Sequence, residues 1–297
     1  MNTWLSIDIG GTKISSAMIV DGEIIDYHQI ETPKTMGEHK VIKDVLYDVM
    51  SKYKGLVDSC SIATAGIVRS GKVRAMSKDR LWGHEPFNLS DLVKSALKVP
   101  VYIINDAQAA AYCEYIKGDH QNNMGYITVS TGVGGGLVIN GSLLTGINGL
   151  AGHIGHTQSA SLGLSQRCNC GRENCVEALA SGTAIAAAMK SITNQDVTAK
   201  EVFEKYRHGN LFAKKIIDAS ASVIANAIAD LKIGLDIEHV VIGGSVGLAE
   251  GYVELVSDKL QSLPPIYNIP VTRAVCHHSS GLIGAYLWAN DNKEVSV

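Results

Sequence analysis

One pattern occurs twice in this 297-residue chain, and it restricts the fold more than any other feature. Each time an apolar run ends in glycines and a second apolar run follows, as expected of two strands joined at a tight turn. The copies start about 120 residues apart, which indicates a weak internal duplication and therefore two related α/β units. The first copy comprises residues 3–9, Gly10-Gly11 and 14–20, and the second comprises 124–131, 132–136 and 137–144.

The remaining apolar periodicity predicts a mixture of strands and helices around these two hairpins. Asp21-Gly22 has the composition of a two-residue turn leading into a further strand at 23–30. No Pro- or Ser-rich linker separates the halves, so we expect two lobes that pack closely around a cleft. Other strand-like runs are 57–65, 99–104 and 239–242, and helical patterns cover 38–53, 105–117, 178–190, 198–207, 211–234 and 281–290.

Composition and charge exclude several classes of protein. A hydrophobic fraction of 46% rules out a disordered chain, and a net charge of −3 argues against nucleic acid or an anionic membrane as the main partner. The chain has no run of about 18 apolar residues, so we expect no transmembrane helix. The first residues lack the pattern of a signal peptide, and we therefore expect a cytoplasmic protein.

Both glycine turns have the composition of a phosphate-binding loop. In the first, Asp8-Ile-Gly-Gly-Thr-Lys13, backbone N–H groups and a hydroxyl would lie beside a phosphate, and Asp8 would hold Mg²⁺. The second, Thr131-Gly-Val-Gly-Gly-Gly136, leads into a strand and not a helix, which argues against a Rossmann dinucleotide site. An ordinary glycine hairpin is the alternative for each loop.

A third glycine segment, Gly66–Val73, nearly matches the P-loop pattern of nucleotide-binding proteins. It lacks the Ser or Thr that would bind Mg²⁺, and no helical pattern follows it. We interpret Ser70-Gly71 as a hairpin turn and Lys72 as a surface residue.

A histidine and three cysteines have the spacing of a metal site. His156, Cys168, Cys170 and Cys175 would form a closed tetrahedral shell around a structural Zn²⁺. The alternative is three buried free cysteines, but residues 157–174 are too polar for a core segment. The other cysteines, Cys60, Cys113 and Cys276, lie in apolar surroundings and are predicted to be core residues.

Asn105-Asp106 follows directly on the apolar run 99–104. A carboxylate at the end of a buried strand faces the crevice where α/β proteins bind ligands, and it could act as general base on a substrate hydroxyl. The alternative is a simple helix N-cap. Glu177, just after the last cysteine of the metal motif, is open to a functional or a structural interpretation.

Together these segments resemble the ROK family of bacterial sugar kinases, part of the actin/hexokinase-type ATPase superfamily. The resemblance spans nearly the whole chain, and its cysteine-rich signature is the most specific part. The matching segments are DIGGTK (8–13), NDAQAAA (105–111), STGVGGG (130–136), GHIGH (152–156), CNCGRENCVE (168–177) and IGGS (242–245).

The resemblance implies an α/β fold of two actin/hexokinase-like (ribonuclease H-like) lobes with a cleft between them and a zinc-bound loop in the larger lobe. The small lobe would hold residues 1–118 with the C-terminal helix 281–297 packed back on it, and the large lobe residues 119–280. ATP with Mg²⁺ and a structural Zn²⁺ are the implied cofactors. A homodimer is the implied assembly.

Matching motifs also imply roles for individual residues. Asp106 would be the catalytic base, and His156 would contact the sugar as well as the zinc. The sugar site would comprise Gly66, Asn105, Asp106, His153, His156 and Glu177. The ATP site would comprise Asp8, Gly10, Gly11, Thr12, Lys13, Thr131, Gly132, Gly134, Gly243 and Gly244.

Within the family the chain is most similar to members that phosphorylate N-acetyl-D-mannosamine at its 6-hydroxyl in sialic acid catabolism. The runs that carry this likeness are INDAQAAA, ITVSTGVGGG, GLAGHIGHT and GGSVGLAEGY. The alternatives are a glucokinase or other hexose kinase of the family, and a non-catalytic sugar sensor. Asp106 and both phosphate loops argue against the sensor, and we expect no N-terminal DNA-binding helix because the phosphate strand starts at residue 3.

Two positions depart from the family pattern. His153 stands where the family usually has Glu, and residues 79–82 read Asp-Arg-Leu-Trp in place of an Asn-Leu pair near an aromatic residue. A carboxylate accepts hydrogen bonds from sugar hydroxyls, whereas an imidazole can face the carbonyl of a 2-acetamido group. We therefore interpret His153 as favouring the 2-acetamido sugar. The alternative is that it only packs against the zinc loop.

Overall fold

The computed structural model describes residues 2–33, 39–77, 81–118, 122–159, 166–276 and 279–293, and the chain divides into two compact units. Unit 1 consists of Met1–Gly118, Thr145–Ala151 and Cys276–Val297, and unit 2 of Asp119–Leu144 and Gly152–Val275. The sequence-based division places residues 119–280 in the large lobe, whereas the structure assigns residues 145–151 and 276–280 to unit 1. Hydrogen bonds to one helix of unit 1 hold both segments there: Gln108 Nε2 donates to Ala151 O at 2.9 Å, and Glu114 Oε1 accepts from Cys276 N at 2.8 Å.

Unit 1 is built on a five-stranded sheet with the order β3-β2-β1-β4-β8. The strands β1, β2 and β3 form antiparallel hairpins, whereas β4 is parallel to β1, and β8 is parallel to β4. Asp21 and Gly22 have φ angles of 49° and 93°, the geometry of the predicted two-residue turn. The strand bounds are β1 Thr3–Ile9, β2 Lys13–Val20, β3 Glu23–Glu31, β4 Ser59–Thr64 and β8 Val101–Asn105.

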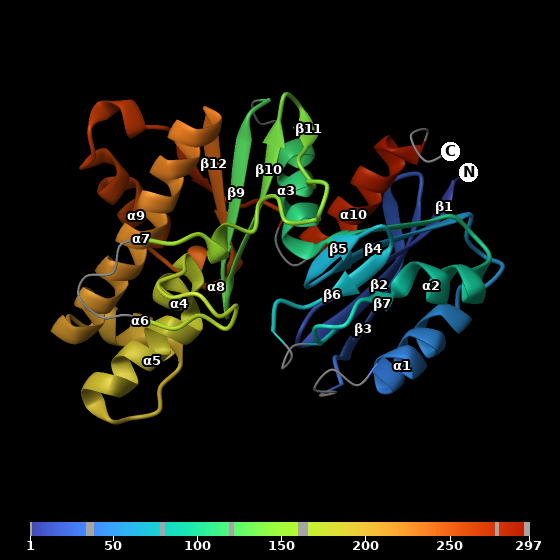
Figure 1. Ribbon diagram of the computed structural model, residues 1–297, viewed down its shortest axis with the longest axis horizontal. Coiled ribbons are helices and arrows are strands. Elements are labelled where there is room, and N and C mark those ends of the chain that lie inside the picture. The colour runs from blue at the N-terminus through green and yellow to red at the C-terminus, as the bar shows by residue number, and fades with distance from the viewer. Residues whose placement is uncertain are drawn as a thin grey trace. The chain divides into compact units, whose positions relative to one another are not determined.

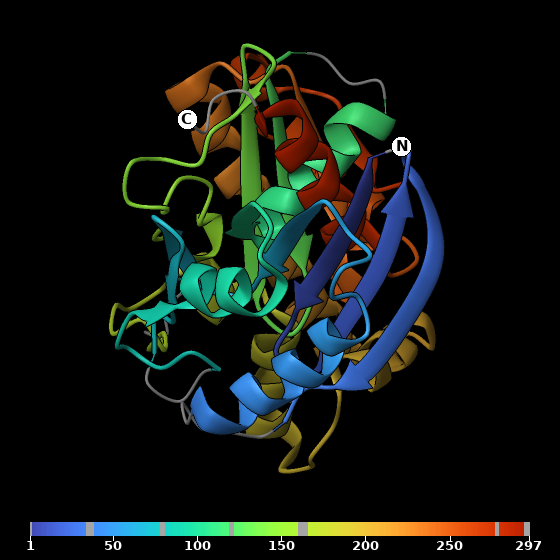
Figure 2. The same cartoon turned by 90° about the vertical axis from the view of Figure 1, so that its right-hand side faces the viewer.

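Helices cover both faces of this sheet, whose first strands are the blue arrows of Figure 2. On one face, α1 (His39–Ser51) and α2 (Leu89–Leu97) pack against Leu5 and Ile7 of β1. On the other, α10 (Ser280–Asp291) packs against Trp4 and Ile19, and α3 (Asp106–Lys117) lies against α10. Residues alternate between the two faces along β1 because side chains on a strand have a period of two. Residues 294–297 of the predicted C-terminal helix lie outside the described ranges.

A smaller sheet with the order β5-β6-β7 belongs to unit 1. Ser70 and Gly71 turn between β5 and β6 with φ angles of 48° and 73°, and Lys72 is exposed. The hairpin interpretation of this segment is therefore confirmed. The bounds are β5 Ile67–Arg69, β6 Lys72–Arg74 and β7 Phe87–Asn88.

Unit 2 contains a second five-stranded sheet, with the order β11-β10-β9-β12-β13. As in unit 1, an antiparallel hairpin forms one half and parallel strands form the other, so the predicted duplication is confirmed at the level of sheet topology. Figure 1 shows β12, β9 and β10 side by side. The bounds are β9 Met124–Val129, β10 Val133–Ile139, β11 Ser142–Leu143, β12 His239–Gly243 and β13 Val271–Arg273.

The core of unit 2 lies between this sheet and its helices. Ile127 and Val129 of β9 and Val240 and Ile242 of β12 are buried against apolar side chains of the long helix α7 and its neighbours. The bounds are η1 Ile154–His156, α4 Val176–Ala180, α5 Gly182–Thr193, α6 Ala199–Arg207, α7 Leu211–Leu235, α8 Gly244–Gly247, α9 Tyr252–Gln261 and η2 Pro265–Tyr267.

Three predictions about local structure are wrong. The strand predicted at 137–144 begins at Val133, because the glycines before it continue the ladder and let η1 approach: a Cβ on Gly135 would lie 2.6 Å from Ile154 Cδ1. The helix predicted at 178–190 is broken at Ser181, which is extended and whose Oγ accepts from Ala184 N at 3.1 Å. Cys276 is only half-buried because it lies in the connection before α10, whereas Cys60 and Cys113 are core residues.

None of the helices in the described ranges combines the length and the apolar character that crossing a membrane requires.

Candidate active site

Two carboxylates lie at the carboxyl edge of the unit 1 sheet. Asp8 is the penultimate residue of β1, and Asp106 directly follows β8. The parallel strands are in register, with Ile9 opposite Thr64 and Thr64 opposite Asn105, so their ends meet at one edge. This is the edge at which open α/β sheets bind ligands.

Asn105, and not Asp106, is the N-cap of α3. Its Oδ1 accepts hydrogen bonds from Ala107 N at 3.0 Å and Gln108 N at 3.1 Å, and its Nδ2 donates to Gly66 O at 2.9 Å. Asn105 occupies the N-cap position, and Asp106 Oδ1 also accepts from Ala107 N at 2.8 Å. Because the cap satisfies the first turn, it fixes the backbone that carries Asp106 and ties it to Gly66.

Burial raises the pKa of both carboxyl groups. The pKa of Asp8 rises to about 7, and the charge of the nearby Asp106 adds to that shift. Burial also raises the pKa of Asp106, although hydrogen bonds from Ala107 and Asn105 partly offset the effect. A carboxyl group with a raised pKa is a better proton acceptor near neutral pH than an ordinary one.

The first glycine loop is a tight connection between β1 and β2. Ile9 pairs with Ile14, and Gly10 N donates to Lys13 O at 2.9 Å. A Cβ on Gly11 would meet no atom within 4 Å, so this backbone borders open space that a ligand could occupy. Those features are what a phosphate-binding hairpin requires.

The second glycine loop is likewise a tight connection, between β9 and β10. Val129 pairs with Val133, and Ser130 N donates to Gly132 O at 2.9 Å. Glu177 Oε2 accepts from Val133 N at 3.0 Å, and a Cβ on Gly132 would overlap that oxygen. The structure therefore places the carboxylate of Glu177, predicted for the sugar site, on the backbone of this loop.

The other residues predicted for ATP are positioned by strand ends. Gly134 lies within β10, opposite Thr128. Gly243 ends β12, and a Cβ there would overlap the Tyr126 ring. Gly244 has a φ angle of 85°, in the left-handed region that glycine favours, and begins α8.

The four predicted zinc ligands lie together. Their donor atoms are all within 4.8 Å of one another, with Cys168 Sγ 3.6 Å from His156 Nδ1 and Cys170 Sγ 3.6 Å from Cys175 Sγ. Ligands at about 2.3 Å in a tetrahedron are about 3.8 Å apart, so this donor set fits Zn²⁺. Cys175 immediately precedes α4, which carries Glu177.

The two positions that depart from the family pattern differ in their surroundings. His153 is half-buried and immediately precedes η1. Trp82 is buried in the core of unit 1, where it stacks on Phe87 and its Nε1 donates to Thr64 Oγ1 at 2.9 Å. Asp79 and Arg80 of the same loop lie outside the described residues.

Sequence reasoning missed residues that support these groups. Thr32, the residue after β3, holds the first loop: its N donates to Thr12 O at 3.0 Å and its Oγ1 to Gly10 O at 2.7 Å. Gly281 in α10 lies against Asp8, and a Cβ there would overlap the carboxylate. Neither contact has a local sequence signal, because each joins segments that are distant in the chain.

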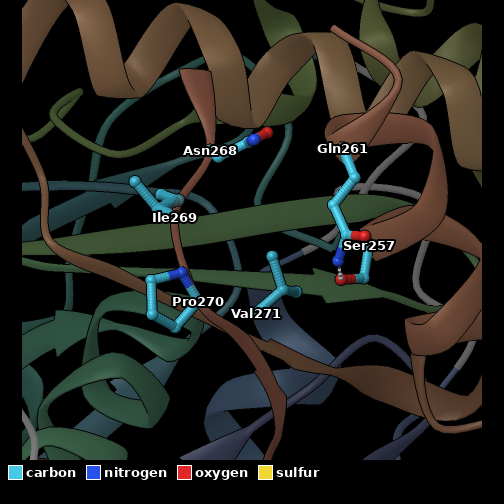
Figure 3. Close-up of a pocket in the computed structure, with 6 residues that line it drawn as sticks. All are labelled: Ser257, Gln261, Asn268, Ile269, Pro270 and Val271. Carbon is cyan, nitrogen blue, oxygen red and sulfur yellow. Dashed lines mark hydrogen bonds between the residues drawn. The ribbon is translucent and has the colours of Figure 1, made fainter. Parts of the chain in front are cut away.

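A surface pocket of about 650 Å³ lies elsewhere, in unit 2 (Figure 3). It holds none of the predicted site residues and no carboxylate, histidine or cysteine. It therefore offers no group for acid–base or metal chemistry. Its lining residues come from α9 and the segment leading into β13: Ser257, Gln261, Asn268, Ile269, Pro270 and Val271.

Comparison with known proteins agrees with the motifs. The chain matches the ROK family over residues 4–292. It belongs to this family. An N-acetylmannosamine kinase from Yersinia pseudotuberculosis is 44% identical over 97% of this chain and 99% of its own length.

Solved structures of the family share the fold. A ROK hexokinase from Thermus thermophilus has a TM-score of 0.82 and 29% identity, covering 97% of this chain and 99% of that one. A ROK family glucokinase from Streptomyces griseus, in complex with glucose and AMPPNP, has a TM-score of 0.75 and 28% identity, covering 98% and 100%. The predicted family and its mixed α/β sugar-kinase fold are confirmed.

The raised pKa of Asp8 predicts a pH-dependent cost to stability. Unfolded Asp8 ionises near 3.8 and folded Asp8 near 7, so the unfolded state binds fewer protons between these values and stability falls as pH rises through them. Asp8→Asn removes this cost. The Tm of Asp8→Asn relative to wild type, measured in metal-free buffer, should increase from pH 4 to pH 8, by roughly 2–4 °C for each kcal/mol of cost removed.

Asp44→Asn is the matched control, because Asp44 is an exposed carboxylate on α1. The Tm difference of Asp8→Asn should increase with pH more steeply than that of Asp44→Asn. Equal pH dependence of the two differences would contradict the raised pKa of Asp8.

Proposed function

We propose that this protein is an ATP-dependent kinase that phosphorylates N-acetyl-D-mannosamine at the 6-hydroxyl, a step of sialic acid catabolism. One observation carries the choice of sugar: the 44% identity, over nearly both full lengths, to an N-acetylmannosamine kinase. Family membership and the likeness to a glucokinase solved with glucose and AMPPNP support ATP-dependent sugar phosphorylation in general.

The two glycine loops would bind the phosphates of ATP through backbone N–H groups. The first loop comprises Gly10–Lys13, and the second includes Thr131 and Gly132, with Gly134 in the following strand. Gly243 and Gly244 would lie beside the adenosine. Phosphoryl transfer depends mainly on positioning and charge stabilisation, which rigid hairpins can supply.

Asp106 would take the proton of the 6-hydroxyl as the γ-phosphoryl group of ATP is transferred to that oxygen. Its position at the sheet edge, its fixation by the Asn105 cap and its raised pKa suit this role. Asp8 would hold Mg²⁺. A cation at Asp8 would reduce the repulsion between the carboxylates of Asp8 and Asp106, and a bound Mg²⁺ neutralises charge on the phosphates.

The sugar itself would contact Gly66, Asn105 and Asp106 of unit 1. His153, His156 and Glu177 of unit 2 are the further predicted contacts. We further propose that the protein acts in the cytoplasm as a homodimer.

An ADP-release assay over a panel of sugars tests the function. N-acetylmannosamine should give the highest kcat/KM, and Asp106→Asn should keep the fold but lose roughly 10²–10⁴ in kcat because proton removal is lost. Asp44→Asn should turn over normally. Highest efficiency with glucose would favour the hexokinase alternative, silence with every sugar would favour the sensor, and near-normal turnover of Asp106→Asn would refute the base.

The Cys/His cluster predicts a structural zinc. His156, Cys168, Cys170 and Cys175 would hold about one Zn²⁺ per chain, fixing the loop that carries His156 and leads to Glu177. Cys170→Ser should lose the metal, thermal stability and sugar binding together, as measured by elemental analysis, calorimetry and titration. Cys276→Ser, which removes a thiol outside the cluster, should retain the metal. A metal-free wild type with full activity would sink this prediction.

His153 predicts the preference for a 2-acetamido sugar. His153→Glu should lower kcat/KM for N-acetylmannosamine by about tenfold, because a carboxylate would face the acetyl carbonyl, and should raise the relative efficiency with glucose. Both sugars are measured in the same assay. If the ratio of the two efficiencies does not change, other residues discriminate between the sugars and His153 only packs against the zinc loop.

A further inference from the structure

The junction between α4 and α5 holds the second phosphate loop from behind. This segment, residues 177–183, makes hydrogen bonds with both sides of the loop Ser130–Val133. Besides Glu177, which accepts from Val133 N, it uses two donors at the start of α5. Gly182 N donates to Ser130 O at 2.7 Å, and Thr183 donates to Thr131 O from its N at 3.3 Å and from its Oγ1 at 2.8 Å.

The start of α5 suits this contact. Ser181 caps the helix, and the N–H groups of Gly182 and Thr183, which have no partner within a helix, are satisfied by carbonyls of the loop. Gly182 is required for the approach, since a Cβ there would lie 2.9 Å from Ser130 O. The positive end of the helix dipole therefore lies behind a loop whose Thr131 side chain is exposed, an arrangement that favours an anion in front of it.

We infer that Thr183 is a positioning residue that holds the second loop in the shape that binds the phosphates of ATP. This inference rests on the proposed kinase function. Thr183 acts through its hydroxyl on Thr131 O.

Thr183→Val tests the hydroxyl at nearly constant shape. Titration calorimetry with Mg-ADP and with adenosine should show a loss of about 3–10-fold for ADP, the effect of one hydrogen bond, and a change within about twofold for adenosine. In steady state the KM for ATP should rise by a similar factor, with the KM for sugar unchanged. Thr183→Ser keeps the hydroxyl and should restore ADP affinity.

Ser191→Ala is the matched control, because the Ser191 hydroxyl bonds Ala188 O near the far end of the same helix. It should leave every value unchanged. Equal losses for ADP and adenosine in Thr183→Val, or no loss for either, would overturn the role of Thr183.

The positioning role of Thr183 and the kinase function are refuted by different results. A wild type that binds ADP while Thr183→Val binds it equally well refutes the positioning role and leaves the kinase function standing. A wild type that binds neither ADP nor ATP refutes the kinase function itself, and the positioning role falls with it.

Discussion

Parallel pairing of β1, β4 and β8 is the contact on which the chemistry of unit 1 depends. Its register brings the ends of three strands, drawn from residues 3 to 105, to one edge, and so sets Asp8 near Asp106. The pairing is stabilised by apolar side chains buried on both faces, as parallel sheets require. Burial in that packing raises the pKa of Asp8 to about 7, which costs stability. Carboxyl groups with a perturbed pKa are typical of functional sites.

Each glycine hairpin is supported by a residue outside it. Thr32 holds the loop of unit 1 and Thr183 that of unit 2, in both cases by a hydroxyl and an N–H that donate to loop carbonyls. A short turn has few internal hydrogen bonds, and such outside bonds limit its motion. The duplication thus extends from sheet order to the way the loops are anchored, although the anchors come from different elements.

The Cys/His cluster is linked to the second loop by the backbone. Val176 N donates to Thr157 O at 2.9 Å, and one residue later Glu177 reaches Val133 N. The helix that the sequence predicts as continuous over 178–190 is divided at Ser181, and this break lets Gly182 and Thr183 turn toward the loop. Ser181 is a residue type that caps helices and so could indicate this break, but the apolar periodicity over 178–190 favours a single continuous helix.

Local sequence alone determined the two hairpins, the clustered glycines, the Cys/His spacing and the strand that ends at Asp106, because each depends on backbone angles or residue chemistry within a few positions. Tertiary structure alone decided that Asn105 bonds Gly66 O, that Trp82 fills the core of unit 1, and that Thr32, Gly281 and Thr183 support the site. These last contacts join segments from about 20 to more than 250 residues apart. Sheet order and helix packing set such contacts, and no short window of sequence contains them.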